Sequence, residues 1–425
     1  MKIAIIGSGI SGLVAAHHLH KAHDLSVFEA NDYVGGHTHT HSIELAGKTW
    51  SVDSGFIVFN DWTYPNFIAL LDELGVQSQP SSMSFSVKCE RTGLEYNGTS
   101  LNSLFAQRQN LLRPSFLGMV RDILRFNREA PNLIETGDDA LTLGQYLAGH
   151  GYSKAFRDHY IVPMGAAIWS AHPAGMLDFP AKYFVRFFHN HGMLSVNRRP
   201  VWRVVRGGSC SYVEPLTQNF CDRIRLGTPI DRVTRSPAGV FVKPRSGEPE
   251  RFDAVVFACH SDQALATLGD ASTEERVILG AIPYQENEAI LHTDASVLPR
   301  KRLAWAAWNY HVRQDTRDRV AVTYNMNILQ SLAASETFCV SLNYREAIDP
   351  NRVIRRMVYH HPAYTPTAVA GQQRHDEISG KNRTFYCGAY WGFGFHEDGV
   401  NSALKVVEQI ARSENHAELS LRRAG

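Results

Sequence analysis

The feature that most constrains this chain is a glycine pattern between two short apolar segments near its start. Residues 2–6 form an isoleucine-rich run typical of a strand buried on both faces, and the run GSGISG follows directly at residues 7–12. Residues 13–21 have the apolar spacing of a helix, and a second apolar segment, 25–28, ends at Glu29. The order strand, glycine turn, helix, strand and acid predicts a Rossmann-like unit within an α/β fold.

Each position in this unit has a physical role in binding a dinucleotide. Gly7 permits the tight turn, Gly9 lets the backbone approach a diphosphate, and Gly12 allows the helix to pack closely on the strand. Ser11 lies in the glycine turn just before the helix, whose free N–H groups and positive dipole end attract phosphates. Glu29 is placed to accept hydrogen bonds from ribose hydroxyls, and its charge disfavours a 2′-phosphate. The alternative is a glycine-rich turn that binds nothing.

Composition excludes several classes of protein. Of the 425 residues, 44% are hydrophobic and 20% charged, which is a globular rather than a disordered makeup. Lys and Arg number 43 and Asp and Glu number 42, a balance that argues against nucleic acid as the main partner. The six cysteines include no C-x-x-C pair, so we expect no zinc ribbon, and reduced thiols in a cytoplasmic protein.

The sequence also bears on the membrane. The glycines at residues 7–9 interrupt the apolar start of the chain too early for a secretory signal. No run reaches the roughly 18 uncharged apolar residues that a membrane-spanning helix needs. We therefore expect a soluble protein, at most peripheral to the inner face of the membrane.

A second signature follows the acid at the end of the Rossmann-like unit. It reads EANDYVGGHTHT over residues 29–40 and resembles the acid and Gly-Gly pair of the flavin-containing amine oxidase superfamily, which includes carotenoid desaturases and protoporphyrinogen oxidase. The resemblance implies FAD as the cofactor, bound non-covalently because no Cys or His lies in an attachment motif. It implies that the loop lies along the diphosphate and leads toward the isoalloxazine ring. The cofactor-binding residues of this segment are Ala30, Gly36, His37 and Thr38. The family usually has Arg where this chain has His37.

Further motifs that resemble the superfamily follow in its order. Gly55 lies in a DSGF turn like the next flavin-contacting segment, and RGGS at residues 206–209 is similar to the turn that returns the chain to the FAD domain. The resemblance implies that Ile230 contacts the adenine through its backbone. It also implies that Ala258, at the end of an apolar strand, begins the family's small-residue turn.

The last motif lies near the C-terminus. Gly388 ends an apolar strand, and an aromatic stretch leads from it to Asp398, Gly399 and Val400, before a helix expected over residues 401–410. In the family this helix points its N-terminus at the pyrimidine edge of the flavin, where its dipole stabilises negative charge on the reduced ring. The resemblance makes the backbone N–H near Val400 the donor, and gives Asp398 and its neighbour Glu397 a role in orienting the ribityl or phosphate region.

These matches predict a Rossmann-like FAD-binding domain interleaved with an α+β substrate domain. We expect the FAD-binding domain at residues 1–60, 195–265 and 380–425, and the substrate domain at residues 61–194 and 266–379. Apolar spacing predicts helices over residues 113–131 and 143–160 for a helical cap. Alternating and β-branched residues predict the strands of a mixed sheet at 289–292, 305–310, 320–324 and 338–342.

Two groups that the superfamily uses in amine oxidation are missing. Its amine oxidases place a Lys near the flavin N5, and the corresponding stretch, residues 284–294, contains none. The Tyr expected beside the C-terminal helix falls at about Gly399. These absences argue against simple amine oxidation.

Aromatic residues instead predict an apolar pocket, with ordinary core packing as the alternative. They gather at residues 179–188, 305–310 and 391–395. The WNY strand and the FHEDG signature are also similar to the FAD domain that precedes plant cyclopropane fatty acid synthases, which implies an acyl-lipid substrate. Residues 182–188 mix basic and aromatic side chains, as a membrane-surface contact would, although a buried helix explains them as well.

Two histidines are candidates for acid–base catalysis. His396 and His311 lie in the aromatic segments, and imidazole titrates near neutral pH. The alternative for both is a hydrogen-bonded structural histidine. His37, His39 and His41 alternate along the chain, but no acid or Cys lies beside them, so we expect no metal site.

Three functional hypotheses follow. The first is an FAD-dependent oxidase or desaturase that takes a hydride from an apolar, acyl-lipid substrate onto flavin N5. The second is an amine oxidase with rearranged catalytic groups. The third is a non-catalytic relative, since Rab GDP-dissociation inhibitors have this architecture and bind proteins rather than FAD. The intact glycine pattern and Glu29 argue against the third hypothesis.

Overall fold

The N-terminal strand lies at the centre of a parallel sheet. The computed structural model describes residues 1–136, 138–314 and 319–424. The sheet consists of β1 (Lys2–Ile6), β2 (Asp24–Phe28), β10 (Ile224–Arg225), β14 (Ala254–Phe257) and β20 (Thr384–Tyr386). Its strand order is β10-β2-β1-β14-β20, and every neighbouring pair is parallel. The predicted Rossmann-like sheet is confirmed.

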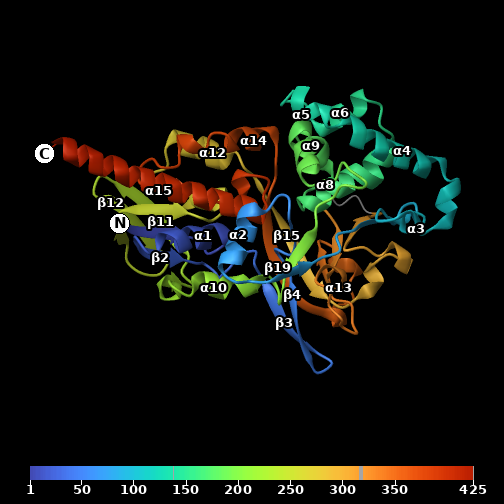
Figure 1. The fold of residues 1–425 in the computed structure, drawn as a ribbon, viewed down its shortest axis with the longest axis horizontal. Helices are drawn as coiled ribbons and strands as arrows, with labels where there is room; N and C mark the ends of the chain where they lie inside the picture. Colours follow the sequence, from blue (N-terminus) through green and yellow to red (C-terminus); the bar gives the residue numbers. More distant parts are fainter. Residues whose placement is uncertain (137, 315–318, 425) are drawn as a thin grey trace.

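Both faces of this sheet are covered, because the side chains of β1 alternate between two cores. Ile3 and Ile5 pack with α1 (Ile10–Leu19) and the first half of the long helix α15 (His396–Ala424). Ala4 and Ile6 pack with the opposite layer. That layer contains β11 (Ile230–Ser236), β12 (Gly239–Pro244), β13 (Glu250–Phe252), α11 (Ser261–Thr267) and α12 (Thr273–Gly280). Figure 1 shows α15 running along this half of the molecule to the C-terminus.

A seven-stranded mixed sheet forms the other half. Its order is β19-β15-β18-β17-β16-β7-β8, and only β16 and β7 pair in parallel. The strands are β7 (Phe85–Cys89), β8 (Glu95–Asn97), β15 (Tyr284–His292), β16 (Trp308–Val312), β17 (Val322–Asn325), β18 (Cys339–Leu342) and β19 (Val353–Pro362). All four strands predicted from alternation are present, so the mixed sheet is confirmed.

Helices from one insertion cap the mixed sheet. Figure 1 shows them grouped at the end of the molecule opposite the two termini. They are α3 (Leu101–Leu104), α4 (Pro114–Glu129), α5 (Asn132–Thr136), α6 (Leu143–Gly149), α7 (Lys154–Phe156), α8 (Val162–Ile168) and α9 (Ala181–Asn190). The single helix predicted over residues 143–160 is wrong, because Gly151 takes a left-handed backbone (φ +64°) and Ser153 caps a new start.

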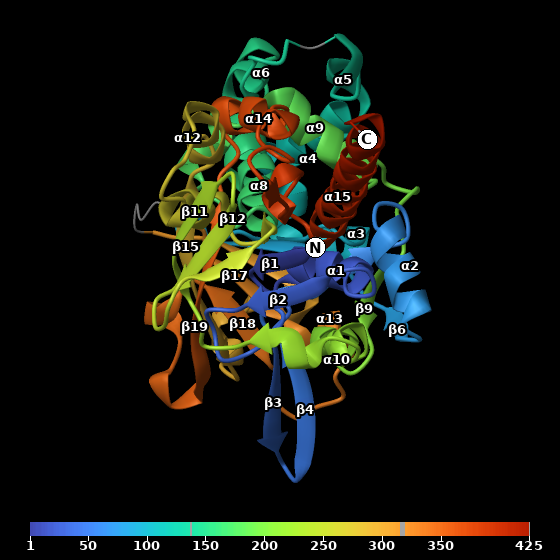
Figure 2. The same ribbon diagram turned by 90° about the vertical axis from the view of Figure 1, so that its left-hand side faces the viewer.

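The remaining elements join the two halves. A small antiparallel sheet contains β5 (Phe59–Asn60), β9 (Trp202–Val205) and β6 (Ser78–Pro80). The hairpin of β3 (Thr40–Leu45) and β4 (Lys48–Asp53) projects from the body, as Figures 1 and 2 both show. The connecting helices are α2 (Pro65–Glu73), α10 (Val213–Thr217), α13 (Met326–Leu329) and α14 (Pro366–Gln372).

The structure bears on two expectations about membranes, the absence of a membrane-spanning helix and the role of residues 182–188. In the part of the chain that the structure describes, no helix is long and apolar enough to cross a membrane. Residues 182–188 lie in α9, where Phe184, Val185, Phe187 and Phe188 are buried. The buried-helix interpretation of that segment is therefore correct, and its role as a membrane contact is not supported. The domain boundaries stay a prediction.

Candidate functional site

The glycine turn after β1 has the shape that a bound diphosphate needs. Gly7 has a φ of +108°, and a Cβ on Gly12 would lie 2.0 Å from the carbonyl oxygen of Gly7. A Cβ on Gly9, in contrast, would have no atom within 4 Å. No side chain caps the first turn of α1. Gly12 is thus required for packing, whereas Gly9 borders open space beside free N–H groups.

Glu29 directly follows β2 and lies next to the glycine turn, where it binds Ser8. Its Oε2 accepts hydrogen bonds from the Ser8 backbone N–H (2.9 Å) and hydroxyl (2.6 Å). Its Oε1 accepts from the Asn31 backbone N–H and side-chain amide, both at 2.9 Å. Because two of these four donors are side chains, ribose hydroxyls can replace them without leaving a backbone group unpaired.

The Gly-Gly loop and the C-terminal motif both meet the glycine turn. A Cβ on Gly36 would lie 3.1 Å from the Cα of Gly9. A Cβ on Gly399 would lie 2.7 Å from Ile10 and 3.0 Å from the Ser11 hydroxyl, so α15 and α1 start side by side. We call the meeting point of these segments the glycine junction, consisting of Gly7, Gly9, Gly12, Gly36 and Gly399.

The other sequence-predicted cofactor residues have the following contacts. Ala258 lies against Gly7, where a Cβ would be 2.8 Å from the Ala258 carbonyl oxygen. Ile230 shares a core with β1, and Val400 is buried against α1. The backbone N–H of Gly388 donates to the Ser402 hydroxyl (2.9 Å) in the first half of α15. Ala30 follows Glu29 and is exposed.

His37 and Gly55 form a tight contact beside the junction. A Cβ on Gly55 would lie 2.2 Å from the His37 carbonyl oxygen, which also accepts the Phe56 N–H at 2.7 Å. The His37 ring faces His260 and His361, with ring centroids 6.3 and 5.6 Å away. Burial lowers the pKa of His37 and of His260 to about 4 and that of His361 to about 3. Neutral imidazoles therefore occupy the place where the family usually has a permanent cation.

We expect this histidine cluster to make the stability of the protein sensitive to acid. Because the folded pKa of His361 lies below its ordinary value of 6.5, the unfolded chain binds the proton first, and stability is lost as the pH falls below 6.5. His361→Asn is expected to make this loss shallower in thermal melts of the FAD-free protein. The matched control is His360→Asn at the neighbouring exposed position. Equal acid dependence in wild type and His361→Asn would show that the cluster does not govern it.

The two carboxylates of the C-terminal motif differ in their contacts. Glu397 accepts the backbone N–H groups of Asn66 (3.0 Å) and Phe67 (2.8 Å), and so caps α2 rather than orienting a cofactor. Asp398 accepts the Phe395 N–H at 2.9 Å, and burial raises its pKa to about 7. The expectation for Glu397 is thereby corrected, and the cofactor role of Asp398 stays a prediction.

His396 is fixed among aromatic and hydroxyl groups. Its Nε2 lies 2.8 Å from the Tyr212 hydroxyl and 3.2 Å from that of Thr38, and its ring stacks on Phe56 at 3.5 Å. Burial lowers its pKa well below the ordinary value, so the ring is neutral at pH 7. Through Thr38, this histidine positions the loop that follows Gly36. Its catalytic role stays a prediction.

His311 lies in a buried hydrogen-bond chain within the mixed sheet. His292 Nδ1 accepts the Asp294 N–H, so its Nε2–H donates to Ser341. Ser341 and Thr323 are 2.7 Å apart, and Thr323 is 2.9 Å from His311 Nε2. The described residues give His311 Nδ1 no partner. These contacts are all internal to the sheet, and the structure does not bring His311 and His396 together.

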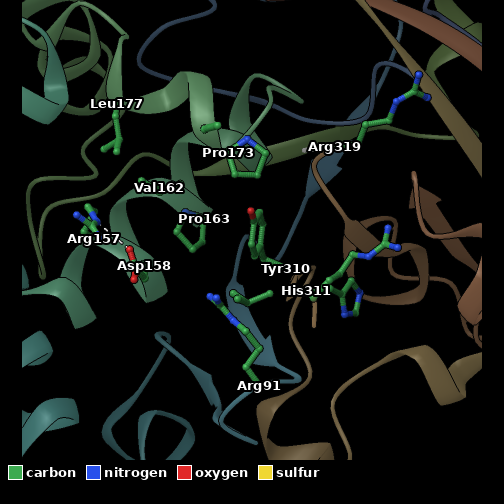
Figure 3. A pocket seen from close by; sticks show the side chains of 13 residues that line it. Arg91, Arg157, Asp158, Val162, Pro163, Pro173, Leu177, Tyr310, His311 and Arg319 are labelled. Carbon is green, nitrogen blue, oxygen red and sulfur yellow. Dashed lines mark hydrogen bonds and ion pairs between the residues drawn. The ribbon is translucent and has the colours of Figure 1, made fainter. Parts of the chain in front are cut away.

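A cavity of 370 Å³ lies between α8 and β16. Figure 3 shows Tyr310 in its centre, with Pro163 and Pro173 beside the ring and Arg91 and Arg319 further out. His311 also lines this cavity. Because consecutive strand residues point to opposite faces of a sheet, its ring is not on the same face of β16 as the Tyr310 ring. None of the cavity's lining residues belongs to the glycine junction.

An aromatic layer connects the helical cap to the start of α15. Tyr183 donates to the Gly392 carbonyl (2.7 Å), and Trp169 donates to that of Phe393 (3.1 Å). Ring centroids are 4.5 Å apart for Tyr183 and Phe393, and 5.0 Å apart for Phe187 and Phe395. The layer contains Trp169, Phe179, Tyr183, Phe187, Tyr364, Phe393 and Phe395. Sequence reasoning missed Trp169 and Tyr364, which lie outside the aromatic-rich segments 179–188 and 391–395.

The described residues contain no group of three or more His, Cys, Asp or Glu side chains that could hold a metal. The rings of His39 and His41 are 4.2 Å apart, but each has another partner. His39 contacts the Tyr359 hydroxyl at 3.1 Å, and His41 contacts the Ser54 hydroxyl at 2.8 Å.

Known proteins similar to this chain point to one family. A 1-hydroxycarotenoid 3,4-desaturase of Flavobacterium sp. (strain P99-3) is 40% identical over 106 residues, which are 24% of this chain and 20% of the relative. A flavin-dependent L-tryptophan oxidase of Lentzea aerocolonigenes is 42% identical over 55 residues, 13% of this chain and 12% of the relative. The aligned segments thus span a fifth or less of these relatives.

Solved structures show the same fold over the whole chain. Cyclohexylamine oxidase from Brevibacterium oxydans IH-35A has a TM-score of 0.70 at 15% identity, covering 97% of this chain and 99% of that one. A CLA-producing fatty acid isomerase from P. acnes has a TM-score of 0.68 at 17% identity, covering 96% and 98%. The sequence model of flavin containing amine oxidoreductases matches residues 10–294. The chain belongs to the flavin containing amine oxidoreductase family and is an FAD-dependent oxidoreductase.

Proposed function

We propose that this enzyme binds FAD non-covalently at the glycine junction and oxidises or desaturates an apolar, acyl-lipid substrate. In this proposal the diphosphate lies over Gly9, and Glu29 holds the adenosine ribose. The open space at Gly9 and the uncapped start of α1 support this placement. The start of α15 beside Ser11 supports a flavin whose far end faces a second helix N-terminus.

The flavin, when bound, supplies the acceptor for a hydride, and the chain supplies the surroundings. The N-terminus of α15 offers its dipole to negative charge on the reduced ring. His396 fixes Thr38 and hence the loop after Gly36. The aromatic layer excludes water next to α15. Its Tyr183 and Trp169 donate to backbone carbonyls, and the buried Tyr364 hydroxyl has no partner among the described residues.

The observation that carries the proposal is this largely buried aromatic layer, together with a strand β15 that has no lysine. β15 reads YQENEAILH, and its Gln285 and Asn287 side chains donate to the Ser170 carbonyl oxygen. Those amides are committed to the helical cap rather than free to bind an amine. The fold of the fatty acid isomerase and the aligned segment of the carotenoid desaturase add support for an apolar substrate.

Anaerobic reduction of the bound flavin tests the substrate class. Acyl lipids of varied chain length are expected to bleach the flavin absorbance, and a panel of primary and secondary amines is not, since no lysine is present on β15. Lipid extracts from cells with and without the protein supply candidate substrates. Bleaching by amines but not by lipids would instead support the second hypothesis, an amine oxidase with rearranged groups, for which the fold of cyclohexylamine oxidase is the supporting observation.

A further inference from the structure

The helical cap lies at the end of the molecule opposite both termini (Figure 1). Its helix α4 carries an exposed face of leucine and arginine. On α4 the exposed side chains recur at intervals of four, three and four residues, at Leu117, Arg121, Leu124 and Arg128. Leu112, which is 87% exposed, and the partly exposed Arg113 lie just before the helix. We call this surface the leucine–arginine face, consisting of Leu112, Arg113, Leu117, Arg121, Leu124 and Arg128.

The opposite side of α4 accounts for the packing of the helix, so the exposed leucines are not needed for the core. Phe116, Met119 and Phe126 are buried against the rest of the cap. Leu124 is 55% exposed although it lies two residues from Phe126. Single exposed leucines are ordinary on a protein surface, but here Leu117 and Leu124 share one helix face and Leu112 is exposed just before it. Exposed apolar side chains that gather in one region are typical of an interaction site.

The charge of this region is one-sided. Residues 98–129 contain five arginines and two acids, Asp122 and Glu129, and Glu129 pairs with Arg125 (2.9 Å) and Arg128 (3.0 Å). Asp122 is buried and accepts the Ser153 N–H at 2.9 Å, so it does not neutralise the surface. Among the described residues, the side chains of Arg113 and Arg121 have no hydrogen-bond or ion-pair partner. Cations beside exposed leucines match an anionic lipid surface, which offers phosphates to the arginines and acyl chains to the leucines.

A second copy of the chain fits this face poorly. In a two-fold contact the same patch meets itself, and Arg121 and Arg113 of both copies would be brought together without an acid to pair them. Nucleic acid leaves the leucines unexplained. We infer that the leucine–arginine face binds the surface of an anionic bilayer. This inference is independent of the substrate assigned above.

Co-sedimentation of the FAD-loaded protein with vesicles tests the inference. Vesicles of phosphatidylcholine with about a third phosphatidylglycerol are expected to bind the wild type at low salt, and vesicles of phosphatidylcholine alone are not. Arg113→Gln/Arg121→Gln is expected to weaken binding roughly 30-fold, from about 1 kcal/mol for each arginine near the surface. Leu112→Ser/Leu124→Ser is expected to weaken it at least about 10-fold through lost apolar insertion.

The matched control removes one cation and one exposed apolar side chain elsewhere. Arg276→Gln/Val277→Ser lies on α12, where Val277 is 53% exposed, and it is expected to bind like the wild type. Flavin absorbance and melting temperature should be unchanged in all three variants, because none of these side chains is buried.

Wild-type protein that stays in the supernatant with anionic vesicles, or variants of the face that bind like wild type, would overturn the inference. A dimer in light scattering that Leu112→Ser/Leu124→Ser dissolves would identify a second copy as the occupant and also overturn it.

Discussion

A Gly9→Ala variant is expected to fold normally and to bind FAD about 10- to 100-fold more weakly. The Gly9 backbone has φ −69° and ψ 177°, which any residue adopts, and no atom lies within 4 Å of the added Cβ. In the proposed complex, however, that methyl group occupies the space of the diphosphate, and such overpacking costs about 1–3 kcal/mol. Fluorescence titration of the FAD-free protein with FAD measures the effect.

Acid precipitation of the wild type is expected to release its flavin into the supernatant, as non-covalent binding requires.

Two other glycines provide controls for this variant. Gly98→Ala adds a methyl group in equally open space away from the glycine junction, and it should bind FAD like the wild type. Gly12→Ala should fail to fold stably, since its Cβ would lie 2.0 Å from the Gly7 carbonyl oxygen. Wild-type affinity in a folded Gly9→Ala protein would contradict the placement of the diphosphate.

Glu397→Ala is expected to destabilise the protein by about 3 kcal/mol, because buried donors lose a charged acceptor. Its carboxylate holds the Phe67 N–H at 2.8 Å and the Asn66 N–H and side-chain amide at 3.0 Å, and it is 6% exposed. These bonds connect the start of α15 to α2. The melting temperature of the FAD-free protein should fall by several degrees.

Graded substitutions separate this capping role from a direct role in binding the cofactor. Glu397→Gln keeps one acceptor oxygen and is expected to lose less stability than Glu397→Ala. Asn401→Ala removes only the exposed bond to Asn66, at 2.8 Å, and should be close to neutral. An unchanged melting temperature for Glu397→Ala, together with a large loss of FAD affinity, would contradict the capping role and restore the cofactor role expected from the motif.

Local patterns predicted the parts of the fold that are set by neighbouring residues. The strand at residues 2–6 is correct, because a continuous apolar run predicts a strand buried on both faces. The helix after the glycine turn is also present, but it spans Ile10–Leu19 rather than residues 13–21. The strand predicted over residues 289–292 is part of β15, which begins earlier, at Tyr284. The order of the motifs in the superfamily then indicated that separate segments of the chain form one FAD-binding domain, which no local sequence pattern could show.

The contacts that the sequence did not reveal all span large separations along the chain. Glu397 finds its partners 330 and 331 residues away, on α2. His396 meets Thr38 and Tyr212 at separations of 358 and 184 residues. Imidazole and carboxylate are chemically suited to catalysis and to structural bonding alike, so their roles depend on partners that only the folded chain supplies. A glutamate beside the start of a helix carries no sign of which helix it caps.

The most direct measurement of the central claim is a crystal structure of the purified protein with FAD. The account predicts the diphosphate over Gly9, with ribose hydroxyls bonded to Glu29 in place of the Ser8 hydroxyl or the Asn31 amide. It also predicts the isoalloxazine ring beside the N-terminus of α15. Flavin located elsewhere, or a glycine junction filled by the protein's own side chains at saturating FAD, would contradict it.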